Sequence, residues 1–221
     1  MNLHDVKQMI EEGEGFELEF KRRISSPEKI ARTIISFANS KGGYILFGVN
    51  DDGKIVGVES EKSEIELIYS ASRDFIDPPI EPLIKVVPFN QRDVIVCYIN
   101  ESKTKPHYYI GENNKDEGES TRVYIRINDK TMMASKEVVK ILKSENPETP
   151  PMRFSIGENE KQLFRHLETN ERITVREFGR LVNISDRRAS RILVRLVHYG
   201  VLRIHTHEKT EYFTLAFVVE Y

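Results

Sequence analysis

Two hydrophobic periods alternate along the first two thirds of the chain. Apolar residues fall at helical spacing in residues 3–12, whereas residues 16–22 alternate between apolar and charged positions, as a half-buried strand does. Residues 44–49 form a nearly continuous apolar run, which is typical of a strand covered on both faces. Because the helical and strand periods interleave without a repeat, the pattern predicts a mixed α/β domain.

The remaining segments of this domain extend the series. Ser26 and Pro27 are typical of a helix start, and the Asn-Asp-Asp-Gly run at residues 50–53 is typical of a tight hairpin turn. We place this first domain at residues 1–145. Its other predicted helices are 26–40, 63–76 and 136–143, and its other predicted strands are 55–58, 84–87, 94–99, 108–110 and 122–127.

The pattern changes after residues 146–151, a polar segment with three prolines that we interpret as a stiff linker. Beyond it, Thr174 and Glu177 have the spacing of a capping box, and Ser185 is a second helix cap. An order of short helices followed by a hairpin predicts a winged helix-turn-helix domain over residues 152–221. Its predicted helices are 158–168, 174–182 and 185–200, and its predicted strands are 201–205 and 211–215.

Charge and cysteine content limit the kinds of binding site that the chain can have. The net charge of the 221 residues is −2, but residues 152–221 hold 12 Lys and Arg against 9 Asp and Glu, so any attraction to nucleic acid is local. The single cysteine, Cys97, excludes an internal disulfide and a cysteine-cluster zinc site. No apolar run approaches about 18 residues, so we expect no membrane partner and a cytoplasmic location.

The third helix of the C-terminal domain carries the main candidate binding surface. Its apolar residues recur at core spacing on one side, and four arginines lie on the opposite side. An arginine fork can bind guanine edges or phosphates with two bonds at once, and in this motif the helix enters the major groove. The predicted DNA contacts are Arg187, Arg188, Arg191 and Arg195, with Lys209, His205 and His207 on the hairpin.

Two other interpretations of this helix stay open. Exposed helices are commonly charged, so the arginines could form a solvated face, and winged helices also serve as protein-interaction modules. A second basic segment contains Lys103, Lys105 and His107. It is either a set of phosphate contacts or a solvated loop.

Several short motifs lie along the first domain, most of them at the predicted strands and turns. They are Glu-Gly-Phe-Glu-Leu-Glu-Phe-Lys at 14–21, Phe-Ala-Asn at 37–39, Gly-Gly-Tyr-Ile-Leu-Phe-Gly-Val at 42–49, Asn-Asp-Asp-Gly at 50–53, Val56-Gly57, Lys105-Pro106 and Tyr124-Ile125-Arg126. Together these motifs resemble the Schlafen/Alba-like DNA-binding domain. The resemblance covers roughly residues 10–145 and implies an Alba-like fold that binds nucleic acid. Bacterial members often carry a C-terminal winged helix and are described as transcriptional regulators.

The same resemblance implies an alternative, enzymatic function. Some animal Schlafen proteins cleave RNA with three acids, and Glu14, Glu19 and Asp51 match those positions. Three carboxylates would suit a hard divalent ion such as Mg²⁺ or Mn²⁺. Glu14 and Glu19 have opposite strand parity, so they converge only if the neighbouring glycines bend the chain. In the structural alternative, Glu17, Glu19 and Lys21 form a surface row of ion pairs, and Asp51 and Asp52 form a turn.

The sequence therefore predicts a two-domain DNA-binding transcriptional regulator that needs no cofactor. The alternatives are a Mg²⁺- or Mn²⁺-dependent ribonuclease acting on RNA, and a winged helix that binds a protein partner. We expect a homodimer on general grounds, because paired DNA-binding helices raise affinity by making the second contact intramolecular.

Overall fold

The computed structural model describes residues 1–111, 122–147, 156–207 and 210–216, and the chain divides into two compact units. The first unit is Met1–Ala134 and the second is Ser135–Tyr221. In these described ranges, no helix combines the length and the apolar character needed to cross a lipid bilayer.

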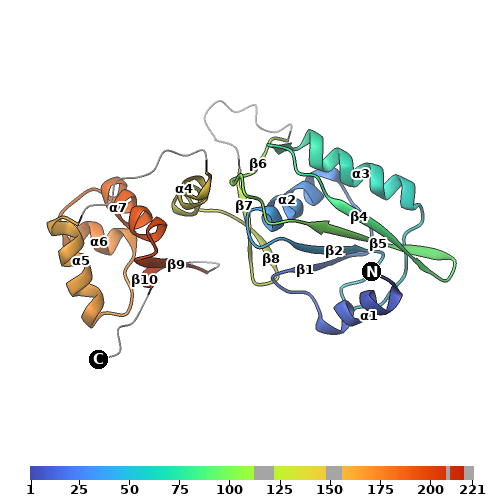
Figure 1. Cartoon of the computed structure of the whole chain (residues 1–221), viewed down its shortest axis with the longest axis horizontal. Coiled ribbons are helices and arrows are strands. Elements are labelled where there is room, and N and C mark those ends of the chain that lie inside the picture. Colours follow the sequence, from blue (N-terminus) through green and yellow to red (C-terminus); the bar gives the residue numbers. More distant parts are fainter. Residues whose placement is uncertain (112–121, 148–155, 208–209, 217–221) are drawn as a thin grey trace. The chain divides into compact units, whose positions relative to one another are not determined.

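A four-stranded mixed sheet forms the centre of the first unit (Figure 1). β1 runs parallel to β2, and the other two neighbouring pairs are antiparallel. The predicted mixed α/β class of this domain is therefore confirmed. The order across the sheet is β1 (Leu18–Lys21), β2 (Gly43–Phe47), β5 (Arg92–Ile99) and β4 (Leu83–Phe89).

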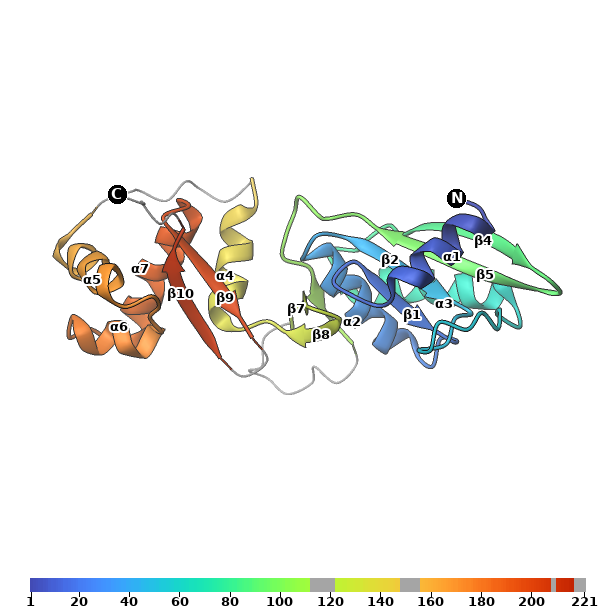
Figure 2. The ribbon, with the colours of Figure 1, turned by 90° about the horizontal axis from the view of Figure 1, so that it is seen from below.

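Helices cover both faces of this sheet (Figure 1, Figure 2). On one face, α2 (Pro27–Ala38) and α3 (Glu61–Asp74) pack around a core that includes Phe37. On the other face, α1 (Leu3–Glu12) packs through the fully buried Val6. Because β2 contributes residues to both cores, its sequence is apolar at nearly every position.

Two short strand pairs lie outside the main sheet. β3 (Ile76–Asp77) pairs with β6 (Tyr108–Tyr109), and β7 (Tyr124–Ile127) forms a hairpin with β8 (Lys130–Met133), with β7 packed against α2. β8 was not predicted, because Lys-Thr-Met-Met shows no clear apolar alternation. The signal for it was Asn128, which turns the hairpin at a φ of 55°.

The predicted strand at residues 55–58 forms only isolated bridges, one near each of its ends. Between those bridges the main chain crosses itself closely, and a Cβ added to Gly48 would stand 2.9 Å from the Cα of Gly57. A regular ladder does not continue through such a crossing, since glycine supplies no side chain to pack on a neighbouring strand.

In its described residues the second unit has four helices and one hairpin. Leu193 of the third predicted helix and Phe213 of the hairpin are fully buried in one apolar core. The elements are α4 (Lys136–Glu145), α5 (Glu158–Thr169), α6 (Val175–Leu181), α7 (Asp186–His198), and the antiparallel strands β9 (Leu202–Thr206) and β10 (Glu211–Leu215).

Two helices of the second unit, α6 and α7, begin at the caps that the sequence predicted. Thr174 and Glu177 form a reciprocal capping box at the start of α6. Ser185 accepts a hydrogen bond from the backbone N–H of Arg188 at 3.4 Å at the start of α7. The same helix ends just before Gly200, whose φ of 70° is typical of a helix stop.

α4 belongs to the second unit, which differs from the predicted division at residues 146–151. Lys140 of α4 donates to Ser190 Oγ of α7 at 2.6 Å, and the Ser190 hydroxyl donates to Glu137 Oε1 at 2.8 Å. These bonds and the packing of α4 on α7 decide its membership. The three prolines made residues 146–151 the more evident break in sequence, and positions 148–151 lie outside the described residues.

We expect Gly43→Ala to lower the free energy of unfolding of the first unit by about 2–3 kcal/mol. Gly43 has a φ of 150°, and a Cβ there would stand 2.5 Å from the Glu17 carbonyl oxygen and 2.6 Å from the Phe37 ring. Hydrogen exchange of the β2 amides measures the loss. Gly15→Ala is the control, because a Cβ on Gly15 meets nothing within 4 Å. Equal protection in the two variants would contradict the close packing at Gly43.

Candidate nucleic-acid interface

A short extended segment between α5 and α6 pairs with the hairpin of the second unit. The backbone N–H of Ile173 donates to the Phe213 carbonyl at 3.0 Å, and the N–H of Phe213 donates to the Ile173 carbonyl at 2.8 Å. Both side chains are fully buried. The order along the chain is therefore helix, short extended segment, helix, helix and hairpin, with the extended segment joined to β10.

α7 presents arginines on the side opposite its buried face. Ala189, Leu193 and Leu196 are fully buried, as the predicted core spacing requires. The arginines at positions 187, 188 and 191 are exposed. The first two lie in the opening turn of α7, where the helix dipole also favours negative charge. The structure thus brings three of the four predicted arginines together on one accessible face.

Arg195 is placed differently from the other three. Its guanidinium forms an ion pair with Glu160, a residue of α5 whose side chain is only 6% exposed. The second oxygen of that carboxylate accepts the backbone N–H of Gly157 at 2.9 Å. Arg195 therefore joins α5 to α7, and its charge is largely balanced within the protein.

A groove of about 510 Å³ separates the start of α5 from the arginine face of α7. Three arginines and two glutamates line it, so its formal charge is slightly positive. A groove of this kind can admit an anionic group alongside α7. The lining residues are Gly157, Glu158, Asn159, Glu160, Arg188, Arg191, Ile192 and Arg195.

Aromatic and cationic side chains stack on the hairpin. The rings of His205 and His207 lie nearly parallel to that of Tyr212, at centroid distances of 4.9 and 5.7 Å. The Arg172 guanidinium lies 5.2 Å from the centre of the same ring. The two histidines were predicted from the sequence, whereas Tyr212 and Arg172 were not. The available signal for Tyr212 was its position directly across the hairpin from His205. Lys209, the remaining predicted hairpin contact, lies outside the described residues.

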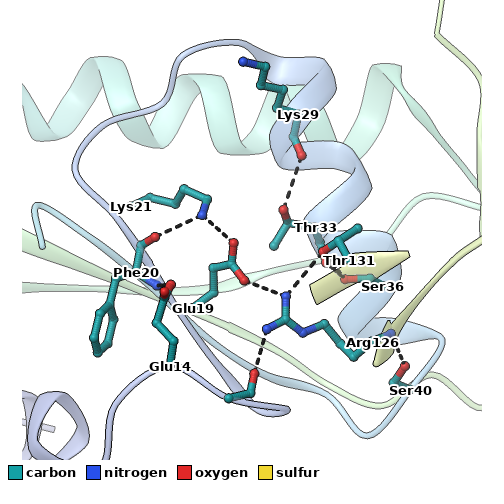
Figure 3. Close-up of polar contacts among 11 residues, drawn as sticks. Glu14, Glu19, Phe20, Lys21, Lys29, Thr33, Ser36, Ser40, Arg126 and Thr131 are labelled. Carbon is teal, nitrogen blue, oxygen red and sulfur yellow. Dashed lines mark hydrogen bonds and ion pairs between the residues drawn. The ribbon is translucent and has the colours of Figure 1, made fainter. Parts of the chain in front are cut away.

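In the first unit, the Glu14 side chain bonds to the backbone within β1 (Figure 3). Its Oε1 accepts the N–H of Phe20 at 2.7 Å. Gly13, with a φ of 80°, turns the chain just before it, as the opposite parity of Glu14 and Glu19 required. One oxygen of this exposed carboxylate is therefore bonded to local backbone structure.

Glu19 is held between two cations. One of its oxygens accepts from Arg126 Nη1 at 2.5 Å, and the other pairs with the Lys21 ammonium (Figure 3). The side chain of Arg126 is completely buried, and its Nη2 donates to the Gly15 carbonyl at 2.6 Å. The proposed row of ion pairs therefore exists for Glu19 and Lys21, but an arginine beneath the surface completes it.

Asp51 lies exposed in the turn that follows β2, and the neighbouring Asp52 accepts the backbone N–H of Lys54 at 3.1 Å. Among the described residues, no group of three or more His, Cys, Asp or Glu side chains is arranged to hold a metal ion. The predicted trio of Glu14, Glu19 and Asp51 is thus divided between a backbone hydrogen bond, an ion pair and a turn.

Lys105 is buried, which corrects its predicted role as a phosphate contact. Its ammonium donates to the Ser40 carbonyl at 3.0 Å and to Glu101 at 2.6 Å. The hydrogen bond from Lys105 lowers the pKa of Glu101, with the Lys105 and Lys41 charges acting in the same direction. Lys103 is exposed and keeps its predicted access to solvent. A loop sequence alone does not distinguish these two lysines.

His107 is buried as a neutral imidazole beside the same loop. Its Nδ1 lies 2.6 Å from the Pro78 carbonyl and its Nε2 lies 2.7 Å from the Ser102 hydroxyl. Since a carbonyl only accepts, Nδ1 carries the proton and Nε2 accepts from the serine. Burial lowers the pKa of His107, against smaller opposing effects of the Pro78 hydrogen bond and the Asp77 charge.

The first unit is similar to known proteins in sequence and in fold. A family model described as "Schlafen, AlbA_2" matches residues 14–135. The N-terminal domain of a RecG-related protein from Nitrosomonas europaea, named for an ATP-dependent DNA helicase, is 22% identical with a TM-score of 0.42, over 59% of this chain and 95% of that one. The DIP2311 protein from Corynebacterium diphtheriae is 15% identical with a TM-score of 0.47, over 78% of this chain and 31% of that one. A search of curated proteins found no match.

We expect Arg126→Met to destabilise the first unit by about 3–5 kcal/mol, because Glu19 and the Gly15 carbonyl would lose a buried partner. Hydrogen exchange of the β1 and β2 amides reports on this unit alone. Arg73→Met, which removes an exposed arginine of α3, is the matched control and should change the free energy by less than about 0.5 kcal/mol. A small loss in Arg126→Met would show that Lys21 alone suffices for Glu19.

We expect His107 to make the first unit less stable in acid. Its pKa in the folded protein lies below the unfolded value of about 6.5, so the unfolded chain takes up the proton first as the pH falls. The stability that the neutral His107 gives to the folded first unit is fully present above pH ~6.5. It is lost as the pH falls below that value, at no more than about 1.4 kcal/mol per pH unit.

Denaturant unfolding measures the free energy of unfolding of wild type and of His107→Gln as the pH falls below ~6.5. Wild type should lose stability more steeply than the variant as the pH falls. His4→Gln, at an exposed position of α1, should keep the wild-type slope. Parallel curves for wild type and His107→Gln would contradict a buried neutral imidazole.

Proposed function

The chain belongs to the Schlafen AlbA_2 family, and from this premise we propose that it is a DNA-binding transcriptional regulator. The observation that carries the proposal is the exposed arginine face of α7, formed by Arg187, Arg188 and Arg191 on a helix whose opposite side is buried. Membership in the family supports a nucleic-acid partner for the first unit. The arginine face supports a second, separate contact.

In this proposal, the second unit is a winged helix-turn-helix domain. α6 and α7 form the helix-turn-helix, β9 and β10 form the wing, and the bridge between Ile173 and Phe213 supplies the short first strand that completes such a domain. α7 is then the helix that enters the major groove with its first turn directed at the bases. The rings stacked on Tyr212 belong to the wing and the Arg172 guanidinium lies against them, which supports a contact of the wing with the DNA backbone.

The chemistry of the exposed arginines suits this role. Each guanidinium offers a planar set of donors that matches two acceptors of guanine or two oxygens of a phosphate. Arg187 and Arg188 also lie where the dipole of α7 favours an anion. Arg195 acts indirectly, because its ion pair with Glu160 fixes α5 against α7. A homodimer would place two such helices on successive half-sites and raise affinity.

The test is binding of mixed duplex DNA by the full chain at several salt concentrations. We expect Arg187→Ala/Arg191→Ala to weaken binding by at least about tenfold and to reduce the salt slope by about two, because two phosphate- or base-contacting charges are removed. Lys7→Ala/Lys85→Ala removes the same charge from exposed positions of the first unit and is the matched control. Equal binding and equal salt slopes in the two double variants would refute the role of α7.

A parallel titration with structured RNA, with and without Mn²⁺, tests the enzymatic alternative. Under the proposed function, RNA remains intact in all conditions. Metal-dependent cleavage that is abolished by Glu19→Gln, but not by Arg187→Ala/Arg191→Ala, would overturn the proposal and move the function to the first unit.

A further inference from the structure

Three arginines surround a cavity in the first unit, away from every residue considered above as a contact for nucleic acid. The cavity has a volume of about 410 Å³. It lies where the parallel strands β1 and β2 end, which is the edge of an open α/β sheet where ligands commonly bind. Its lining residues are Arg22, Arg23, Val56, Gly57, Val58, Glu59, Glu64 and Arg92.

The chain brings these arginines together from two strands. Arg22 and Arg23 directly follow the last residue of β1, and Arg92 is the first residue of β5. β2 lies between β1 and β5 in the sheet, so the two sources face each other across the end of β2. The arrangement therefore depends on the sheet order and not on one segment of sequence.

Gly57 keeps the wall of the cavity thin. Its φ is 68°, and a Cβ there would stand 2.5 Å from the Cβ of Arg92. Any side chain at position 57 would displace the stem of Arg92. The glycine thus allows the arginine to lie directly against the main chain at the edge of the cavity.

Two of the three arginines are uncommitted. Within the described part of the chain, no hydrogen bond or ion pair involves the guanidinium of Arg22 or Arg92, and both residues are exposed. Arg23 is balanced in part by Glu64, whose Oε2 also accepts the Ile24 N–H at 3.0 Å. Glu59 is the second acid of the wall, so the positive charges outnumber the negative ones.

Burial raises the pKa of Glu64, while the Ile24 hydrogen bond and the Arg23 charge act against that rise. The Glu64 carboxylate accepts the Ile24 N–H, and within the described residues no hydrogen bond or ion pair joins it to Arg22 or Arg92. Arg22 and Arg92 are left to an external partner.

We propose that this cavity binds a phosphate group. Two guanidinium forks from different strands can together satisfy several oxygens of one tetrahedral anion, which suits phosphate better than a single carboxylate. The volume exceeds what one phosphate needs and falls in the range of small-ligand sites, so part of a nucleotide fits beside it. The phosphate belongs either to a free nucleotide or to a nucleic-acid backbone, and the site is independent of α7.

The test follows the backbone amides of Gly57 and Val58 by NMR while the full chain is titrated with inorganic phosphate, with AMP and with an eight-nucleotide single strand. We expect saturable shifts at these two amides. Arg22→Gln/Arg92→Gln should weaken binding of the preferred ligand by about tenfold or more, since two charge-assisted contacts are lost. Lys7→Gln/Lys85→Gln should leave it unchanged.

The two sources of phosphate give different orders of affinity. Tighter binding of AMP identifies a nucleotide site, and tighter binding of the oligonucleotide identifies a backbone site. Either result supports the proposal. Absence of saturable shifts in wild type, or equal binding by both double variants, would overturn it, provided that the variants keep the wild-type unfolding midpoint.

The outcome of the phosphate titration does not depend on the function proposed for α7. Arg187→Ala/Arg191→Ala should retain the shifts at Gly57 and Val58, because those arginines do not line the cavity. Loss of the shifts in that variant would also overturn an independent site. Failure of duplex binding by α7 would leave the phosphate titration unaffected.

Discussion

The buried ion pair between Arg126 and Glu19 is the constraint on which the first unit depends. The guanidinium connects β7 to β1 through Glu19, reaches the carbonyl of Gly15, and lies 4.7 Å from the centre of the Phe37 ring on α2. A buried arginine is tolerable only when its partners are held in place, because its desolvation costs several kcal/mol. One side chain therefore holds together β1, the turn at Gly15 and the β7–β8 hairpin.

This pair also explains why the carboxylates of the first unit have separate roles. A carboxylate that already bonds to Arg126 and Lys21 has its charge satisfied by the protein itself. Glu14 is likewise occupied by the backbone of Phe20. The family pattern identifies which acidic residues correspond in sequence to the three acids. Whether such an acid is free to act depends on its partners in the fold, and for Glu19 one partner, Arg126, comes from a distant strand.

Local structure was predictable from the sequence, and contacts between distant segments were not. The caps at Ser26, Thr174 and Ser185 and the amphipathic face of α7 follow from spacing within a few residues, and the structure confirms them. The burial of Lys105 depends on Ser40 and Glu101 lying beside it, which its own loop does not encode. The cavity between Arg22 and Arg92 was not predictable either, because only the order of strands in the sheet makes those residues neighbours.

The bonds of Ser190 to α4 have a consequence for how such a protein can be recombined. The crossing from one unit to the other lies between Ala134 and Ser135, so the proline-rich segment is internal to the second unit. A gene fusion that joined at the prolines would carry α7 into a new protein without α4. Ser190 would then lose both Lys140 and Glu137 as partners. A transferable module therefore begins at Ser135, the cap of α4.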